Sequence, residues 1–291
     1  MAFFLSILTQ AITFLPLAFG ISISYHILRA TDMTMDGSFV IGAAVFARLV
    51  TLGFSPAAAA AAALTCGALC GMLSASIQRG GRVDSLLAGV LATFILSSVN
   101  LIIMGRPNIS LLTQSTLVSS AFAASELTGW MLTGAYAIFI CALVFFILRS
   151  KIGLALRAFG DNPNLFQRLG KNLELHRLLG FAITNMLAAA AGCLTAQTVG
   201  YADVGMGLGM TLTGIGAIIL GQQLLSRFYK KKHLRLGAEF IACLVGVVFY
   251  YFVLNLLLRL DIDPTYLKLM LGLLLIIFLR VAVKPVKRSI A

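Results

Sequence analysis

Long apolar runs alternate with short polar breaks along the whole chain. Runs of about 20 residues recur, and each is long enough to cross a hydrocarbon core of roughly 30 Å. Because every backbone amide in that core must be paired internally, the runs predict helices. A β-barrel would need short alternating strands, whereas these runs are continuous. We therefore expect an all-α polytopic membrane protein, a single transmembrane domain over 1–291, with about nine helices near residues 3–28, 35–53, 56–78, 85–105, 128–148, 178–199, 208–226, 237–258 and 266–282.

Charged residues lie mainly between the runs and indicate topology. The chain is 60% hydrophobic and 11% charged, with a net charge of +12. The basic clusters are Arg79 and Arg82; Arg149, Lys151, Arg157, Arg168, Lys171 and Arg177; Arg227, Lys230, Lys231, Lys232 and Arg235; and Arg280, Lys284, Lys287 and Arg288. With nine helices all four fall on one side, which predicts an N-terminus outside and a C-terminus in the cytoplasm. The basic charge then reflects a protein embedded in a lipid bilayer, and no nucleic acid partner is expected.

Catalytic and metal-binding patterns are not evident. The five cysteines (Cys66, Cys70, Cys141, Cys193, Cys243) fall inside apolar runs, where small buried hydrophobic residues are the simplest interpretation. The three histidines are scattered, and no phosphate-binding Gly-x-x-x-x-Gly-Lys-Ser/Thr occurs. We expect no catalytic residue, metal or cofactor, so ATP-driven work would need a separate ATPase.

One compact polar segment, from Arg149 to Gly170, interrupts the apolar pattern. Asn162 followed by Pro163 is a typical helix start, and Asp161 adds favourable charge near it. Gly170 is a typical stop after the last turn. By their spacing Leu165, Phe166 and Leu169 share one face of this short helix. That face either enters a groove on a partner or lies on the protein's own membrane-facing ends or on lipid.

The run from Gly153 to Pro163, followed by Arg168-Leu169-Gly170, resembles the cytoplasmic signature of ABC-importer permeases of the branched-chain amino acid and ribose type. The resemblance favours the partner-groove interpretation. It implies a coupling helix near 150–177 that binds the ATPase, with contact residues Arg157, Gly160, Asp161, Asn162, Pro163, Leu165, Phe166, Leu169 and Gly170. It also implies a multi-pass protein of the bacterial inner membrane, a cytoplasmic ABC ATPase, an extracytoplasmic substrate-binding protein and a second copy of the chain as partners.

Three further stretches resemble a narrower branch, the permeases assigned to tryptophan or tyrosine uptake. They are residues 32–39, 103–112 and 200–207. This resemblance implies that the cargo is an amino acid, with an aromatic amino acid favoured. One departure is Gln222, after Gly221, where the family pattern leads us to expect an acidic residue. An ion-coupled secondary transporter, or the same importer type carrying another small solute, are the alternatives.

Candidates for the substrate path are few. Asp32 and Asp36 flank the break between the first two helices, and Asn100 is polar within the fourth. Ionisable groups inside a membrane are functional candidates, but all three residues could instead cap helix ends or bridge helices. Closely spaced glycines between 205 and 216 could break the seventh run beside a cavity, or allow tight packing of a continuous helix. Gly67-x-x-x-Gly71 could likewise face another copy or another helix of the same chain.

Overall fold

The computed structural model describes residues 2–228 and 236–260 and isolated positions beyond. Within these ranges seven helices are long and apolar enough to cross a membrane, which confirms an all-α polytopic protein. The elements are α1 (Ala2–Ser22), the π-helix η1 (Ile23–Ile27), α2 (Thr34–Thr51), α3 (Pro56–Ile77), the 3₁₀ turn η2 (Arg79–Gly81), α4 (Ser85–Met104), β1 (Asn108–Ser110), α5 (Leu117–Ala124), α6 (Glu126–Arg149), α7 (Lys151–Asp161), α8 (Pro163–Arg168), α9 (Leu173–Val199), β2 (Tyr201–Asp203), α10 (Met210–Phe228) and α11 (Leu236–Arg259).

Most expected helices appear within a few residues of their predicted ends. The last expected helix, near 266–282, falls largely outside the described residues, as do the side chains of the two basic clusters between 227 and 288. The count of nine and the orientation therefore stay predictions. Sequence periodicity missed α5 and the β1–β2 pair, because each is shorter than the window of about 11 residues over which an amphipathic pattern is judged. The 11-residue α7 was missed as well, because it lies in the polar segment where only α8 was predicted.

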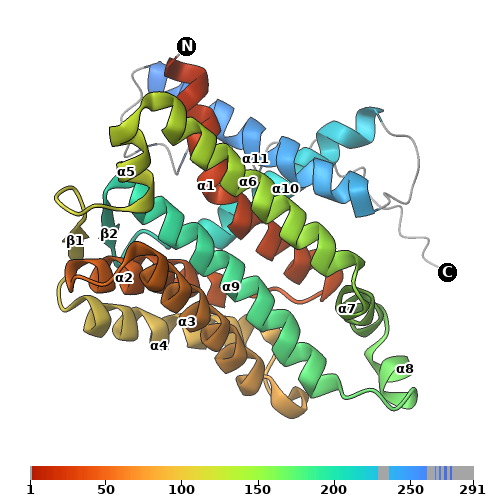
Figure 1. Ribbon diagram of the computed structural model, residues 1–291. Coiled ribbons are helices and arrows are strands. Elements are labelled where there is room, and N and C mark those ends of the chain that lie inside the picture. Colours follow the sequence, from red (N-terminus) through yellow and green to blue (C-terminus); the bar gives the residue numbers. More distant parts are fainter. Residues whose placement is uncertain are drawn as a thin grey trace. The chain divides into compact units, whose positions relative to one another are not determined.

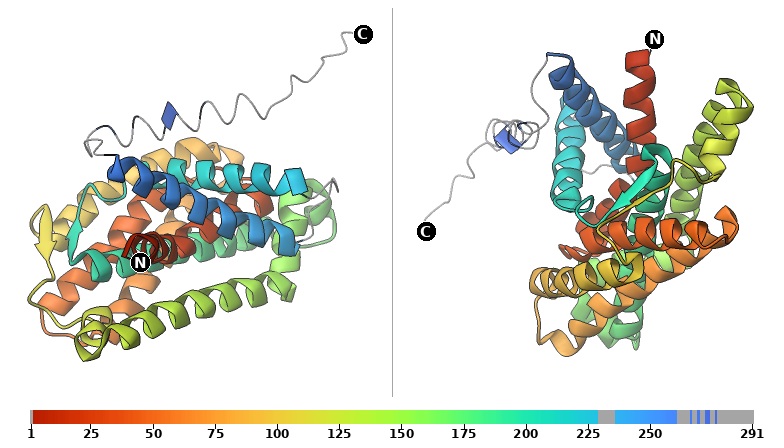
Figure 2. Two further views of the ribbon diagram at one scale, coloured as in Figure 1. Left: turned by 90° about the horizontal axis from the view of Figure 1, so that it is seen from above. Right: turned by 90° about the vertical axis from the view of Figure 1, so that its left-hand side faces the viewer.

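The chain divides into two compact units, Ile12–Gly214 and a second that joins Met1–Ala11 to Ile215–Ala291. In the first unit α9 packs against both α2 and α3, and α4 packs on α2. Helices α7 and α8 lie at one end of this unit and the antiparallel β1–β2 pair at the opposite end (Figures 1 and 2). These are called the α8 end and the sheet end below.

Small residues allow the helices of the first unit to approach closely. A Cβ atom at Gly42 would overlap the backbone of Ala189, and one at Gly192 would overlap the carbonyl oxygen of Phe39. Gly67 and Gly71 meet α9 in the same way. The Gly67-x-x-x-Gly71 motif thus packs α3 on α9 within one chain. Small faces of this kind replace the hydrophobic driving force that helices lack in lipid.

The second unit uses similar contacts. A Cβ at Gly221 of α10 would overlap the carbonyl oxygen of Ala242 on α11, and the reverse contact joins Gly246 to Ala217. Asn255 of α11 donates a 2.9 Å hydrogen bond to Oε1 of Gln10. Gly221, which precedes the glutamine where an acid was expected, therefore has a packing role of its own.

We predict that Gly192→Ala lowers the free energy of unfolding, because the added methyl must displace the Phe39 backbone. The loss should be roughly 1–3 kcal/mol, less the roughly 1 kcal/mol by which alanine favours a helix. Gly134→Ala on α6 is the matched control, since its Cβ meets no atom within 4 Å. Unfolding in mild detergent should rank Gly192→Ala below the wild type and Gly134→Ala at or above it; equal stabilities would contradict this packing.

Candidate functional site

Helix α7 is fixed to the end of α6 by a tight corner. The Ser150 hydroxyl accepts from the Gly153 amide at 3.4 Å, and the Arg157 guanidinium donates to the Leu148 carbonyl at 2.6 Å. A Cβ at Gly153 would crowd two carbonyl oxygens of α6. Arg157, expected among the ATPase-contact residues, thus satisfies a carbonyl at the C-terminus of α6, a position where a cation also suits the helix dipole.

Helix α8 begins and ends where the sequence predicts. Pro163 is its first residue, and the Asn162 carbonyl accepts from the Phe166 amide at 3.0 Å. Gly170 has φ = 72°, and the amides of Gly170 and Lys171 donate to the carbonyls of Gln167 and Phe166. This pair of bonds is the Schellman motif, which requires a residue that tolerates positive φ.

The expected apolar face of α8 is divided between the protein and the surface. Phe166 is only 4% exposed, and its ring packs edge-on against Phe159 of α7 at 6.2 Å and His176 of α9 at 4.8 Å. Leu169 is 68% exposed. The side chain of Leu165 lies outside the described residues. For Phe166 the structure supports the interpretation that the residue packs on its own chain, because a six-residue helix needs an apolar anchor to stay in place.

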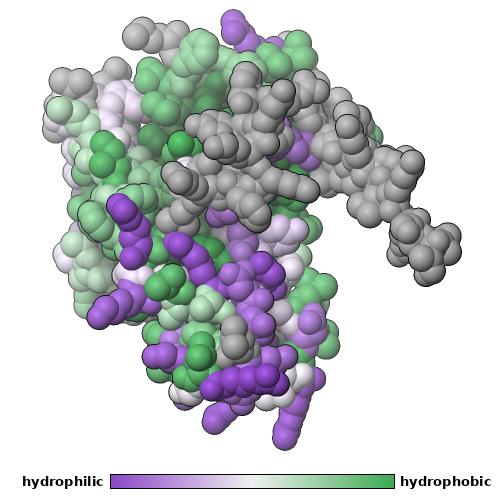
Figure 3. All heavy atoms as spheres, turned by 90° about the vertical axis from the view of Figure 1, so that its right-hand side faces the viewer, coloured by the Kyte–Doolittle hydropathy of each residue, from purple (hydrophilic) through white to green (hydrophobic). Residues whose placement is uncertain are grey.

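The exposed surface of the α8 end combines polar and apolar side chains. Asp161, Asn162, Pro163 and Gly170 are exposed there. Two leucines stand out among them, Leu169 and Leu154, the latter 67% exposed. Figure 3 views the molecule from this side, and hydrophilic residues gather on it with hydrophobic ones between them. Such a surface suits a protein partner better than the hydrocarbon of a membrane.

A second polar region lies beside the middle of α9, where residues 28–33 separate η1 from α2. The Asp32 side chain is buried, and its carboxylate accepts from the Thr34 amide at 2.9 Å and from the Asn185 side-chain amide at 2.7 Å. Asn185 in turn accepts from the Ser38 hydroxyl at 2.7 Å. Asp32 therefore caps α2 and joins it to the centre of α9.

Asp36, in the first turn of α2, caps a different helix. Its carboxylate accepts from the Gly209 amide at 3.0 Å, the Thr211 amide at 2.7 Å and the Thr211 hydroxyl at 2.6 Å. These groups form the start of α10, which follows a turn over 204–209. A Cβ at Gly207 would overlap the Asp36 carbonyl oxygen. The first glycines of this stretch therefore lie in a turn, and α10 is continuous through Gly214 and Gly216. The carboxylate supplied by α2 lies at the positive dipole end of α10.

Helix α4 supplies hydrogen bonds to the break between η1 and α2 and to the first turn of α2. Ser85 donates to the Thr31 carbonyl at 3.0 Å, Thr93 to Met33 at 2.8 Å and Asn100 to Gly37 at 3.3 Å. The Oδ1 atom of Asn100 is buried without a partner among the described residues. Sequence reasoning found Asn100 but missed Ser85 and Thr93, although the three lie on one face of a helix by their spacing.

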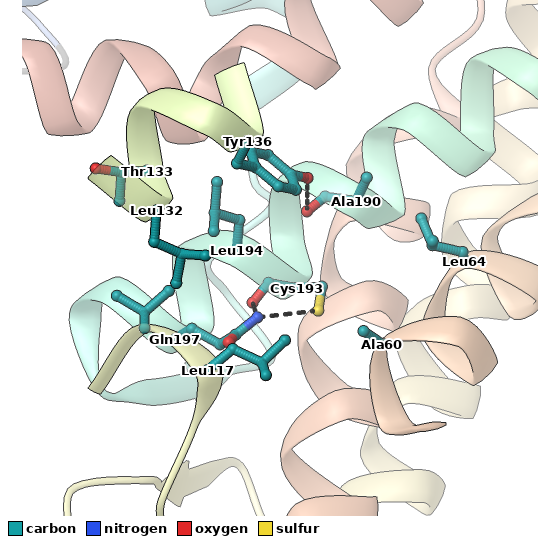
Figure 4. Close-up of a pocket in the computed structure, with 11 residues that line it drawn as sticks. Ala60, Leu64, Leu117, Leu132, Thr133, Tyr136, Ala190, Cys193, Leu194 and Gln197 are labelled. Carbon is teal, nitrogen blue, oxygen red and sulfur yellow. Dashed lines mark hydrogen bonds between the residues drawn. The ribbon is translucent and has the colours of Figure 1, made fainter. Parts of the chain in front are cut away.

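A cavity of about 140 Å³ lies near the sheet end, between α3, α5, α6 and α9 (Figure 4). Its lining residues are Ala60, Leu64, Leu117, Val118, Leu132, Thr133, Tyr136, Ala190, Cys193, Leu194 and Gln197. The Gln197 amide donates to the Cys193 carbonyl at 3.4 Å, while its Oε1 is buried without a partner in the described part of the chain. An apolar cavity of this size can hold one aromatic ring. Among the described residues no group of three or more His, Cys, Asp or Glu side chains could bind a metal.

We predict that Asp36→Ala destabilises the start of α10, because it removes the acceptor of the part-buried Gly209 and Thr211 amides there. The loss should be about 1–2 kcal/mol, the range of a strong helix cap. Hydrogen exchange of 209–213 should accelerate, whereas exchange in the middle of α9 should not change. Asp203→Ala, at the end of β2, is the control, because its carboxylate accepts from the Gly205 amide and the Asn108 side chain. Equal effects of the two variants would argue against a specific cap.

Comparison with known proteins agrees with this architecture. The family of the branched-chain amino acid transport system permease component matches residues 3–279. An uncharacterised protein of Rickettsia prowazekii is 45% identical over 273 residues, covering 94% of this chain and 95% of the relative. A tyrosine transport system permease protein of Clostridioides difficile is 34% identical over 276 residues, covering 94% and 90%. A ribose import permease protein of Escherichia coli is 24% identical over 201 residues, covering 65% and 60%. No solved structure matches the chain.

Members of this family are membrane subunits of ABC transporters that work with separate ATPase and binding-protein subunits. A match over nearly the whole chain, together with the apolar helices, makes this a multi-pass protein of the bacterial inner membrane. The chain belongs to the branched-chain amino acid-type family of ABC transporter permeases.

Proposed function

We propose that this chain is the membrane subunit of an ATP-driven importer, and that its α8 end docks a cytoplasmic ATPase. The exposed, capped α7–α8 segment with Leu154 and Leu169 at its surface is the observation that carries the proposal. Exposed leucines on an ordered polar end, outside the membrane-spanning helices, fit a surface that a partner covers. In this arrangement the ATPase groove receives Leu169 and its surroundings, while Phe166 and Arg157 hold the segment in shape.

The proposed complex contains two copies of this chain, two ATPases and an extracytoplasmic binding protein. The relatives are permease components, which supports the need for these partners. If the α8 end is cytoplasmic, the sheet end faces the binding protein. The positive-inside pattern supports this assignment, because Arg79, Arg82, Lys151 and Arg168 lie at the α8 end, in the short segments between the membrane-spanning helices or at the ends of these helices.

The proposed cargo is an amino acid, with an aromatic one favoured. Two observations support it: the similarity to a tyrosine transport permease over 94% of this chain, and a cavity at the sheet end large enough for one ring. Ribose and nucleoside permeases are more distant relatives, so a different small solute is the second candidate.

The path residues Asp32, Asp36 and Asn100 have a narrower role in this proposal. Both carboxylates already accept two or more hydrogen bonds from the protein, and Asn100 donates to the backbone of α2. Their hydrogen bonds hold the break between η1 and α2 in one geometry. The cargo passes beside the break without binding tightly to it. Weak binding suits a passage, because a tightly bound cargo would not be released.

The first test of the proposed function is docking. Leu169→Asp should place an unpaired charge in the apolar groove of the ATPase and reduce co-purification by at least tenfold, since burying a charge is costly. Membrane insertion should survive, because the change lies outside the membrane-spanning helices. Co-purification with the ATPase and ATP-dependent uptake in proteoliposomes would be measured together.

Leu112→Asp is the matched control for docking. Leu112 is 82% exposed in the connection after β1, at the opposite end of the unit, so its variant should bind the ATPase like the wild type. Full ATPase binding by Leu169→Asp would show that the docking surface lies elsewhere. Uptake by the chain alone, driven by an ion gradient without ATPase, would favour a secondary transporter instead.

The second test concerns the cargo. In cells that carry the permease with its ATPase and binding protein, unlabelled tyrosine or tryptophan should compete with uptake of labelled tyrosine. Leucine, ribose and a nucleoside serve as the comparison set, and each should compete weakly. Competition by one of these solutes and not by the aromatic amino acids would overturn the cargo assignment while leaving the importer proposal intact.

A further inference from the structure

The connection between η1 and α2, residues 28–33, touches both functional regions of the first unit. At one side it meets α7, which carries the docking segment. At the other side it enters the polar region beside the middle of α9. Its first residues lie against the C-terminal end of α7, and Asp32 near its other end binds the Asn185 side chain.

At the α8 end the contact is direct and close. A Cβ at Gly160 would overlap the carbonyl oxygen of Ile27, so the last turn of α7 lies directly on the backbone at the end of η1. The Arg29 guanidinium donates to the Asp161 carboxylate at 2.6 Å. Arg29 has φ = 52°, a left-handed conformation that non-glycine residues rarely adopt. Backbone of this kind, next to a π-helix, is typical of functional rather than purely structural positions.

Inside the bundle the same connection is held by hydrogen bonds at successive residues. Ser24 donates to the Ala30 carbonyl at 2.7 Å and Ser85 to that of Thr31 at 3.0 Å. Asp32 binds Asn185 and the start of α2, and Thr93 donates to the Met33 carbonyl. Because each residue of the connection is held by a hydrogen bond, a displacement of its first residues is passed on to Asp32 and Met33 at its end.

We propose that residues 28–33 transmit movement of the docked α7–α8 segment to the start of α2, and through Asp36 to the start of α10. This inference rests on the proposed function and adds the positioning residues Arg29 and Gly160 to it. The route runs from Phe166 on Phe159, through Gly160 and Asp161 to Ile27 and Arg29, and along the connection to Asp32. Two helix starts in the interior then shift together, because Asp36 of α2 holds the amides of Gly209 and Thr211.

The Arg29–Asp161 ion pair is suited to coupling rather than to stability. The two side chains are 62% and 67% exposed, and exposed pairs contribute little to folding free energy. Removing the pair should therefore leave the folded chain intact. Removing the pair should instead change whether the connection moves together with α7 when the complex passes from one state to another.

The test is a charge exchange in the complete transporter, reconstituted with its ATPase and binding protein. Arg29→Asp should leave ATPase co-purification and detergent stability unchanged and lower the substrate transported per ATP hydrolysed several-fold. Asp161→Arg should lower the same ratio, and the double variant Arg29→Asp/Asp161→Arg should restore most of it. If the ion pair had a purely structural role, the variants would change detergent stability and leave the substrate transported per ATP unchanged.

Arg82→Asp is the matched control, an exposed arginine at the same end whose reversal should leave the ratio unchanged. If Arg29→Asp transports with the wild-type ratio, or the double variant recovers nothing, the connection is not the transmitting element. The wild-type protein separates this outcome from failure of the proposed function. Absence of ATP-driven uptake by the wild type would reject the importer itself, whereas normal wild-type uptake with unaffected variants rejects only the link.

Discussion

The hydrogen bond between the buried Asp32 carboxylate and Asn185 is the constraint on which the first unit depends. It places the start of α2 beside the middle of α9. Once α2 begins there, Asp36 is in reach of the start of α10, and the turn over 204–209 must enter the bundle to meet it. Leaving any of these groups unpaired in a low-dielectric interior would be costly, so these hydrogen bonds fix how the helices are arranged in the interior. Elsewhere in the unit, small residues determine how closely the helices pack.

The sequence predicts the helices well because a long apolar run has one solution in lipid. It predicts α8 equally well, since Asn162-Pro163 and Gly170 act through local backbone conformation. Periodicity does not say which side of a short helix faces inward. Phe166 and Leu169 have compatible spacing, yet one contacts Phe159 and His176 and the other is exposed. That choice depends on where α7 and α9 place their aromatic rings, which only tertiary packing decides.

The polar residues of the interior are likewise predictable from the sequence only in part. Asp32, Asp36 and Asn100 are visible in the sequence because charged and amide groups are rare in apolar runs. Their partners are not, since Asn185, Thr211, Ser85 and Thr93 are ordinary helix residues until the chain brings them opposite an unpaired group. Asn185 and Asp32 are 153 residues apart, and no local pattern joins them. A polar stripe along α4 was the one partner set that helical spacing alone could have revealed.

Two helix starts, those of α2 and α10, come together in the interior, and each is already capped by an aspartate of the chain. A helix start is otherwise a ready site for an anion such as the carboxylate of an amino acid. Under the proposed function, cargo passing this region therefore meets amides that are already paired with carboxyl groups of the chain. Such an interior disfavours a long-lived bound state and leaves selection to the partner that delivers the cargo. The same hydrogen bonds make the region stiff, so that it moves as one piece when the connection from α7 moves. A passage driven from outside the membrane requires this stiffness together with weak affinity for the cargo.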